Sequence, residues 1–157
     1  MSGSPGAGPT DRIPPFRFSL RTRVDFSDTD AVGIVYYGRY PPYFDRAVIA
    51  YRRHLGLPLL GNPGHVLVIR ALRCEYHAPA RFDDELEVFV RMARLGRTSQ
   101  TAALRVEEVG GAEPRHLADG EIVAVGLDRY GGRPSPIPDD IRARIAEFEG
   151  NALEVVS

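Results

Sequence analysis

Two carboxylates occupy a short polar segment, Asp28-Thr29-Asp30, between a stretch with strand-like alternation and a stretch with helical periodicity. A carboxylate at such a junction can attack an electrophilic carbon directly or remove a proton from water. Gly33 follows closely and permits backbone angles or close approaches that other residues resist. We therefore take Asp30 as the first candidate for chemistry, whereas Asp28 is more typical of a turn.

Other residue types that can do chemistry have less support. Cys74 is the single cysteine, and its apolar alternating surroundings favour a structural thiol over a nucleophile. The histidines are far apart in the sequence and lack paired cysteines or a His-x-x-x-His spacing: His54, His65, His77 and His116. We expect no metal site from them.

The composition is that of an ordinary folded domain. The 157 residues are 43% hydrophobic and 26% charged, which suits one domain with a sizeable core. The basic residues are scattered arginines, and the net charge of −1 gives no electrostatic footprint for nucleic acid. No segment approaches the roughly 20 apolar residues that a membrane span needs. We expect a cytoplasmic protein with no nucleic-acid partner.

Apolar periodicity predicts one domain over residues 16–149, between a disordered tail rich in Gly and Pro (residues 1–15) and a C-terminal tail (residues 150–157). A long amphipathic helix begins near Pro41-Pro42 and ends at Gly56. Alternation predicts strands, and an Asp-rich start predicts a short terminal helix over residues 139–148. The expected strands span residues 16–26, 65–76, 85–95, 98–109 and 116–127.

This order of elements predicts an α+β fold, in which an antiparallel sheet of about five strands wraps around one long central helix. A lone helix leaves the other sheet face and the sheet edges partly uncovered. Self-association would cover them, so we expect a dimer, extended to a tetramer.

Several motifs resemble the 4-hydroxybenzoyl-CoA thioesterase family of hot-dog fold acyl-CoA thioesterases. They are residues 26–37 (FSDTDAVGIVYY) with Tyr40 and Asp45, residues 74–86 (CEYHAPARFDDEL) and residues 95–99 (LGRTS). The resemblance covers roughly residues 16–127. It implies a single hot-dog domain that hydrolyses an acyl-CoA or aryl-CoA thioester without a cofactor, since coenzyme A is part of the substrate.

The resemblance also implies roles for individual residues. Asp30 corresponds to the catalytic aspartate, as nucleophile or general base, and the backbone N–H of Tyr37 to the oxyanion hole. Tyr37, where some relatives have a histidine, matches the 4-hydroxybenzoyl type. Pro41-Pro42 can shift the helix start and leave Tyr36 to Tyr40 as a separate turn. The implied substrate-binding residues are Gly33, Tyr36, Asp45, Arg97, Thr98 and Ser99.

Two other classes of function stay open. A hot-dog hydratase would need a His-Asp pairing that no motif suggests. A non-catalytic hot-dog module that binds acyl groups or a partner protein has the same fold, and fold alone does not determine chemistry. The sequence leaves open the acyl group and the choice between a CoA and a carrier-protein thioester.

Overall fold

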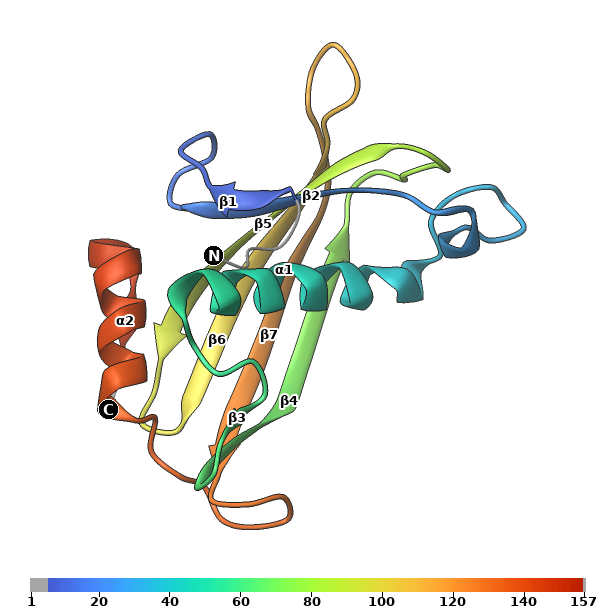
Figure 1. Ribbon diagram of the computed structural model, residues 1–157. Helices are drawn as coiled ribbons and strands as arrows, with labels where there is room; N and C mark the ends of the chain where they lie inside the picture. The colour runs from blue at the N-terminus through green and yellow to red at the C-terminus, as the bar shows by residue number, and fades with distance from the viewer. Residues whose placement is uncertain (1–5, 157) are drawn as a thin grey trace.

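One curled sheet of eight strands forms the frame of the protein in the computed structural model, which describes residues 6–156 (Figure 1). The strand order is β1-β2-β5-β6-β7-β4-β3, with antiparallel neighbours, and β8 pairs with β5 in parallel. The strands are β1 (Ala7–Pro9), β2 (Phe18–Arg23), β3 (Gly61–Asn62), β4 (His65–Tyr76), β5 (Glu85–Leu95), β6 (Ser99–Glu108), β7 (Arg115–Leu127) and β8 (Glu154–Val155).

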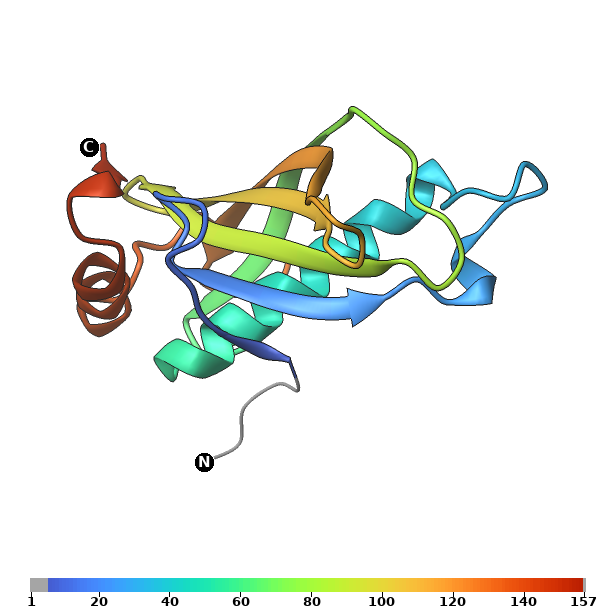
Figure 2. The same cartoon turned by 90° about the horizontal axis from the view of Figure 1, so that it is seen from above.

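The long helix α1 (Tyr40–Leu55) lies across one face of this sheet, as the view from above also shows (Figure 2). The short helix α2 (Asp139–Glu149) packs near the far end of β5. The α+β hot-dog architecture is therefore confirmed. Strands β4 to β7 begin and end within one residue of the predicted limits, because turn residues bound them and because apolar residues alternate clearly in β5 and β6.

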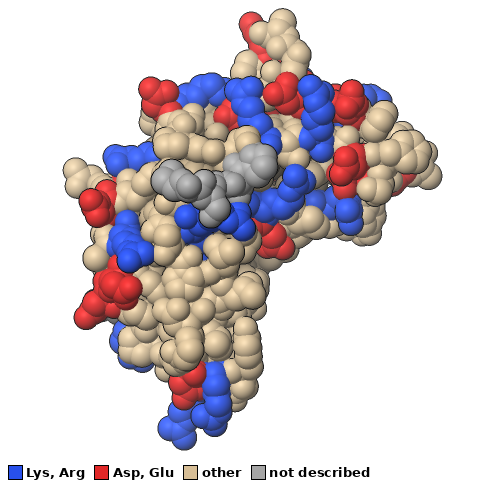
Figure 3. All heavy atoms as spheres, viewed as in Figure 1, with Lys and Arg blue, Asp and Glu red and all other residues tan. Residues whose placement is uncertain are grey.

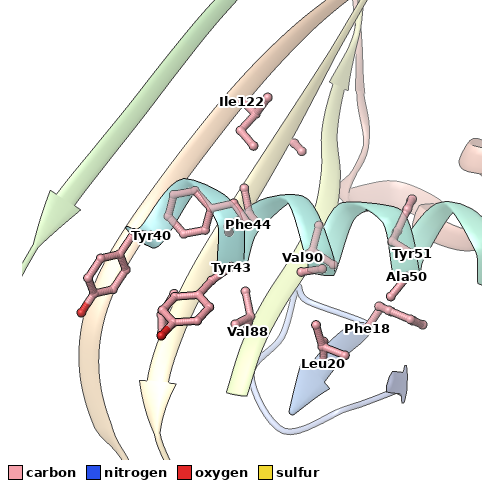
Figure 4. Close-up of a cluster of buried hydrophobic side chains, with 14 of the residues drawn as sticks. Phe18, Leu20, Tyr40, Tyr43, Phe44, Ala50, Tyr51, Val88, Val90 and Ile122 are labelled. Carbon is pink, nitrogen blue, oxygen red and sulfur yellow. The ribbon is translucent and has the colours of Figure 1, made fainter. Parts of the chain in front are cut away.

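The core lies between α1 and the sheet (Figure 4). Buried α1 residues follow the helical period: Tyr40, Tyr43, Phe44, Ala47, Ala50 and Tyr51. Gly120 of β7 leaves room for the Phe44 ring, since a Cβ at Gly120 would lie 2.5 Å from ring atoms. The apolar stripe of α1 predicts that Arg52 is turned away from the core, but this residue is only 3% exposed. It donates hydrogen bonds to the Pro58 carbonyl and the Gln100 side-chain oxygen.

The N-terminal segment differs from the predicted disordered tail. Residues 1–5 lie outside the described residues, but Ala7–Pro9 forms β1 and pairs with β2. Arg12 then forms ion pairs with the buried carboxylates of Glu87 and Glu107, at 3.1 and 2.7 Å. The tail prediction was wrong from residue 6 onward because backbone pairing and these long-range ion pairs order a segment of low apolar content. At the other end, β8 ties the predicted C-terminal tail to β5.

Strand β4 has an open outer edge. Its one partner on that side, β3, covers Val66 and His65 only. Beyond them β4 carries exposed apolar side chains: Ile69, Leu72 and Tyr76. Among residues 6–156, no helix is long and apolar enough to cross a membrane.

Candidate active site

Asp28 is a buried anchor for the segment that precedes α1. Its carboxylate accepts hydrogen bonds from the Tyr43 hydroxyl (2.6 Å), the Asp25 N–H (3.1 Å) and the Arg39 guanidinium (3.0 and 3.1 Å). Burial pushes the pKa of Asp28 upward, but these bonds outweigh burial and hold that pKa below its usual value. Asp28 therefore fixes the polar segment to the first turns of α1.

Asp30 closes a tight loop beside this anchor. Its N–H donates to the Ile34 carbonyl, and the Gly33 N–H donates to the Asp30 carbonyl, both at 3.0 Å. Gly33 has a φ angle of 89°, which glycine adopts without strain. One oxygen of the half-buried Asp30 carboxylate accepts the Val32 N–H at 2.9 Å. The loop thus fixes the Asp30 side chain and leaves it accessible to solvent.

A 3-10 turn, η2 (Tyr37–Arg39), lies next to this loop. The Tyr36 N–H donates to the Asp28 carbonyl at 2.9 Å, and the Tyr76 hydroxyl donates to the Tyr37 carbonyl at 2.8 Å. The Tyr36 pKa is raised, first by the hydrogen bond with the Tyr37 side chain and to a lesser degree by the negative charge of Asp30. The bridge between Thr29 and Val35 and the backbone bond from Tyr36 to Asp28 hold the tyrosine pair beside the Asp30 loop.

The two prolines limit the backbone N–H groups that can donate hydrogen bonds to an oxyanion near the start of α1. Pro41 and Pro42 occupy the second and third positions of α1 and have no N–H to offer. The predicted turn over Tyr36 to Tyr40 is partly confirmed: η2 begins at Tyr37, but it leads directly into α1, which already includes Tyr40. The N–H groups of Tyr37 and Gly38 consequently have no acceptor within the turn. Dipoles at such a turn favour negative charge, the requirement of an oxyanion hole.

A largely apolar pocket of about 380 Å³ runs between α1 and the sheet. Its α1 wall consists of Asp45, Val48, Ile49 and Arg52, and its other walls come from the loop after α1 and from β4 to β7. In the view of Figure 3 an uncharged area lies at the centre below α1, with charged side chains above it, along the left side and at the bottom. A volume of this size suits a small organic group.

Asp45 lies on this pocket and is not a helix cap. The first turn of α1 contains no acidic residue, because the helix begins at Tyr40 and Asp45 belongs to its second turn. A helix start near Pro41-Pro42 predicts Asp45 in the first turn, where a carboxylate favours the helix dipole, and that prediction was wrong. Partial burial raises the Asp45 pKa.

The hairpin residues Arg97, Thr98 and Ser99 are not near Asp30 in this chain. The Asp30 loop meets the sheet at Arg81, beside the start of β5, whereas the hairpin follows the end of β5. The eleven residues of β5 span about 36 Å at 3.3 Å per residue. The Arg97 and Thr98 carbonyls accept the Ile137 and Gly126 N–H groups. One chain therefore does not bring the hairpin and Asp30 into one site.

The sequence analysis did not identify two groups of polar residues. In the pocket, Gln100 is buried and its side-chain nitrogen has no hydrogen-bond partner among the described atoms. Where β4 ends and β7 begins, the side chains of His77, His116 and Asp119 gather with ligand atoms within 4.8 Å of one another. His77 and His116 are far apart in the sequence, but the fold brings them together. Strand pairing, which local sequence spacing does not reveal, joins them.

The curled sheet, the long helix on one face and the aspartate loop before that helix define a hot-dog thioester hydrolase. The thioesterase superfamily model matches residues 32–114. Acyl-CoA thioester hydrolase YbgC of Escherichia coli is 32% identical over 134 residues, which cover 84% of this chain and 96% of the relative. This chain belongs to the thioesterase superfamily.

Solved structures agree with this assignment. A thioesterase superfamily structure from Jannaschia has a TM-score of 0.79 at 25% identity, covering 88% of this chain and 86% of its own. The structure of a gentisyl-coenzyme A thioesterase has a TM-score of 0.70 at 27% identity, covering 82% of this chain and 99% of its own. The resemblance seen in the sequence is thus confirmed.

Proposed function

We propose that this protein hydrolyses acyl-CoA or aryl-CoA thioesters, with Asp30 as the catalytic carboxylate and the N–H groups of η2 as the oxyanion hole. The observation that carries the proposal is the pairing of the fixed Asp30 loop with a turn whose first N–H groups lack acceptors within it. The names of the relatives, an acyl-CoA thioester hydrolase and a gentisyl-coenzyme A thioesterase, support a CoA thioester as the substrate.

Two reaction courses fit this arrangement. In the first, an Asp30 oxygen attacks the thioester carbonyl, the C–S bond breaks to release CoA thiolate, and water hydrolyses the resulting anhydride. In the second, Asp30 accepts a proton from water as that water attacks the carbonyl, and the tetrahedral intermediate expels the thiolate. Negative charge develops on the carbonyl oxygen in both, so both need the N–H groups of Tyr37 and Gly38.

The acyl group is proposed to lie in the pocket beside α1. Asp45 lies five residues after the start of α1, and Arg52 lies seven residues further, about 10 Å along the axis. Between them the walls are apolar, which suits a hydrocarbon or an aryl ring. The unpaired Gln100 nitrogen offers a donor to an oxygen carried by the acyl group.

A second copy of the chain is proposed to complete the CoA site. Because Arg97 and Asp30 lie at opposite ends of β5, Arg97 can contact the phosphates of a substrate at Asp30 only from another protomer. The open edge of β4, with its exposed Ile69, Leu72 and Tyr76, offers a surface for such association.

The experiment that tests the catalytic assignment is Asp30→Asn. Asparagine keeps the size and the acceptor for the Val32 N–H but cannot serve as nucleophile or base. We expect unchanged folding and a loss of turnover of roughly 10² to 10⁴ or more in a free-thiol assay with a panel of acyl-CoA and aryl-CoA thioesters. Asp25→Asn is the control, since Asp25 contributes its backbone N–H to this segment. Near-normal turnover of Asp30→Asn would refute the assignment.

A single-turnover reaction in H₂¹⁸O separates the two courses. Attack by Asp30 leaves ¹⁸O in the Asp30 carboxylate when water hydrolyses the anhydride at the aspartyl carbon, whereas general-base catalysis sends the label to the product acid only. Mass spectrometry of the peptide that contains Asp30 measures the difference. No hydrolysis of any thioester in the panel would instead favour a non-catalytic hot-dog module.

A further inference from the structure

Two histidines and an aspartate meet where β4 ends beside β7. The His77 Nε2 lies 2.9 Å from one Asp119 oxygen, and the His116 Nε2 lies 2.8 Å from the other. The two imidazole rings are 4.5 Å apart between centroids. Three good donors for a transition metal therefore converge on one point, although two of them are 39 residues apart in the chain.

A bulge in β7 creates this convergence. In a regular strand His116 and Asp119, three residues apart, would point to opposite faces. Here Val106 pairs with Ala118 and Glu107 with His116, so Leu117 is an extra residue in β7. The bulge turns His116 to the face of Asp119. The Leu117 carbonyl accepts the His77 N–H at 2.8 Å, which fixes the third residue there.

The cluster lies apart from the pocket under α1. Gly120 faces the Phe44 ring of α1, so its neighbour Asp119 points to the opposite face of the sheet. The side chains of His77, His116 and Asp119 are 40%, 31% and 44% exposed, which leaves a path for an ion and room for water ligands. Glu75 stands opposite Asp119 in the β4–β7 register and adds a nearby carboxylate.

We propose that His77, His116 and Asp119 bind one divalent transition-metal ion of the zinc class. Two tetrahedral metal bonds of about 2.05 Å separate their donor atoms by about 3.3 Å. The imidazole nitrogens now lie 2.9 and 2.8 Å from the Asp119 oxygens, so a shift of about half an ångström opens room for the ion. The ion binds the Asp119 carboxylate and the unprotonated Nε2 of each imidazole, whose proton moves to Nδ1 of the same ring or to water, and water fills the remaining positions. Imidazole ligands select Zn²⁺, Co²⁺ or Ni²⁺ over Mg²⁺.

The bound ion clamps the end of β4 to β7. Tyr76, the residue before His77, donates its hydroxyl to the Tyr37 carbonyl of η2. The clamp therefore steadies the strand end that supports this turn. Metal binding itself does not depend on the proposed thioesterase mechanism, and the test below uses no activity.

Isothermal titration of untagged, chelator-treated protein with Zn²⁺ tests the proposal. We expect one ion per chain with micromolar affinity, no binding of Mg²⁺, and a higher melting temperature in the presence of Zn²⁺. Co²⁺ should give visible absorption bands that depend on the same residues. His77→Ala, His116→Ala and Asp119→Asn should each weaken Zn²⁺ binding at least tenfold and abolish the Co²⁺ bands.

His54→Gln is the matched control, because it removes an exposed imidazole that packs between Phe18 and Phe148, away from the cluster. It should bind Zn²⁺ as the wild type does. Thermal melting without metal verifies that each variant folds, and Asp119→Asn preserves side-chain size where an alanine would not. The proposal is overturned if the wild type does not bind Zn²⁺, or if the cluster variants bind it as tightly as His54→Gln.

Discussion

The substitution Asp28→Ala tests whether Asp28 has a structural role distinct from the catalytic role proposed for Asp30. In the wild type the Asp28 carboxylate receives the Tyr43 hydroxyl, the Asp25 N–H and the Arg39 guanidinium. Alanine leaves the hydroxyl of Tyr43, a residue 2% exposed, without its acceptor, and it leaves the Asp25 N–H unpaired as well. The loop that carries Asp30 then loses its connection to α1.

The magnitude follows from these bonds. A buried polar group without a partner costs about 1–3 kcal/mol, and the Tyr43 hydroxyl loses an ionised acceptor. The Arg39 ion pair adds little, because the Arg39 side chain is 44% exposed and solvent screens it. We expect a loss of about 3 kcal/mol in the free energy of unfolding. For a chain of this size that is a decrease in melting temperature of about 6–12 °C.

Urea unfolding of Asp28→Ala, Tyr43→Phe and the double variant measures this coupling. The double variant should lose clearly less stability than the two single variants together, because they remove the same bond. Asp30→Asn serves as the control and should stay within about 0.5 kcal/mol of wild type, since Asp30 is half-buried and keeps an acceptor for Val32. Additive effects, or a loss below about 1 kcal/mol in Asp28→Ala, would refute the reasoning.

Three further predictions follow from the same structure. Because the folded pKa of Asp28 is lowered from 3.8, its contribution to stability is present above that value and is lost as pH falls through the folded pKa. Acid unfolding should therefore be less pH-dependent in Asp28→Asn than in wild type. Arg97→Ala should raise KM for a CoA thioester and spare a short N-acetylcysteamine thioester; equal effects on both would reject the phosphate contact. Ile69→Asp should shift the chain toward monomer in light scattering, and wild type that is already monomeric at micromolar concentration would contradict association through β4.

Local sequence was sufficient for most of the fold. Strands β5 and β6 alternate clearly, and turn residues bound β4 to β7, so the limits of these strands could be predicted within one residue. The position of helix α1 could also be predicted, from its apolar stripe and from Gly56, which ends the helix in the αL conformation. The N-terminal segment could not be predicted, because β1 is held by pairing with β2 and by Arg12, both long-range contacts.

The candidate site also has a part that local sequence predicts and a part that depends on long-range contacts. The sequence by itself determined the carboxylate, the turn and the prolines around Asp30, because these residues are neighbours in the chain and their chemistry is local. Only the tertiary structure decided that Arg97 lies at the far end of β5 from Asp30. It also decided that Arg52 and Gln100 meet beneath α1. The contact of His77 with His116 and Asp119 likewise comes from the tertiary structure. Those relations depend on strand register and on the β7 bulge, which arise from the pairing of distant segments and leave no trace in local spacing.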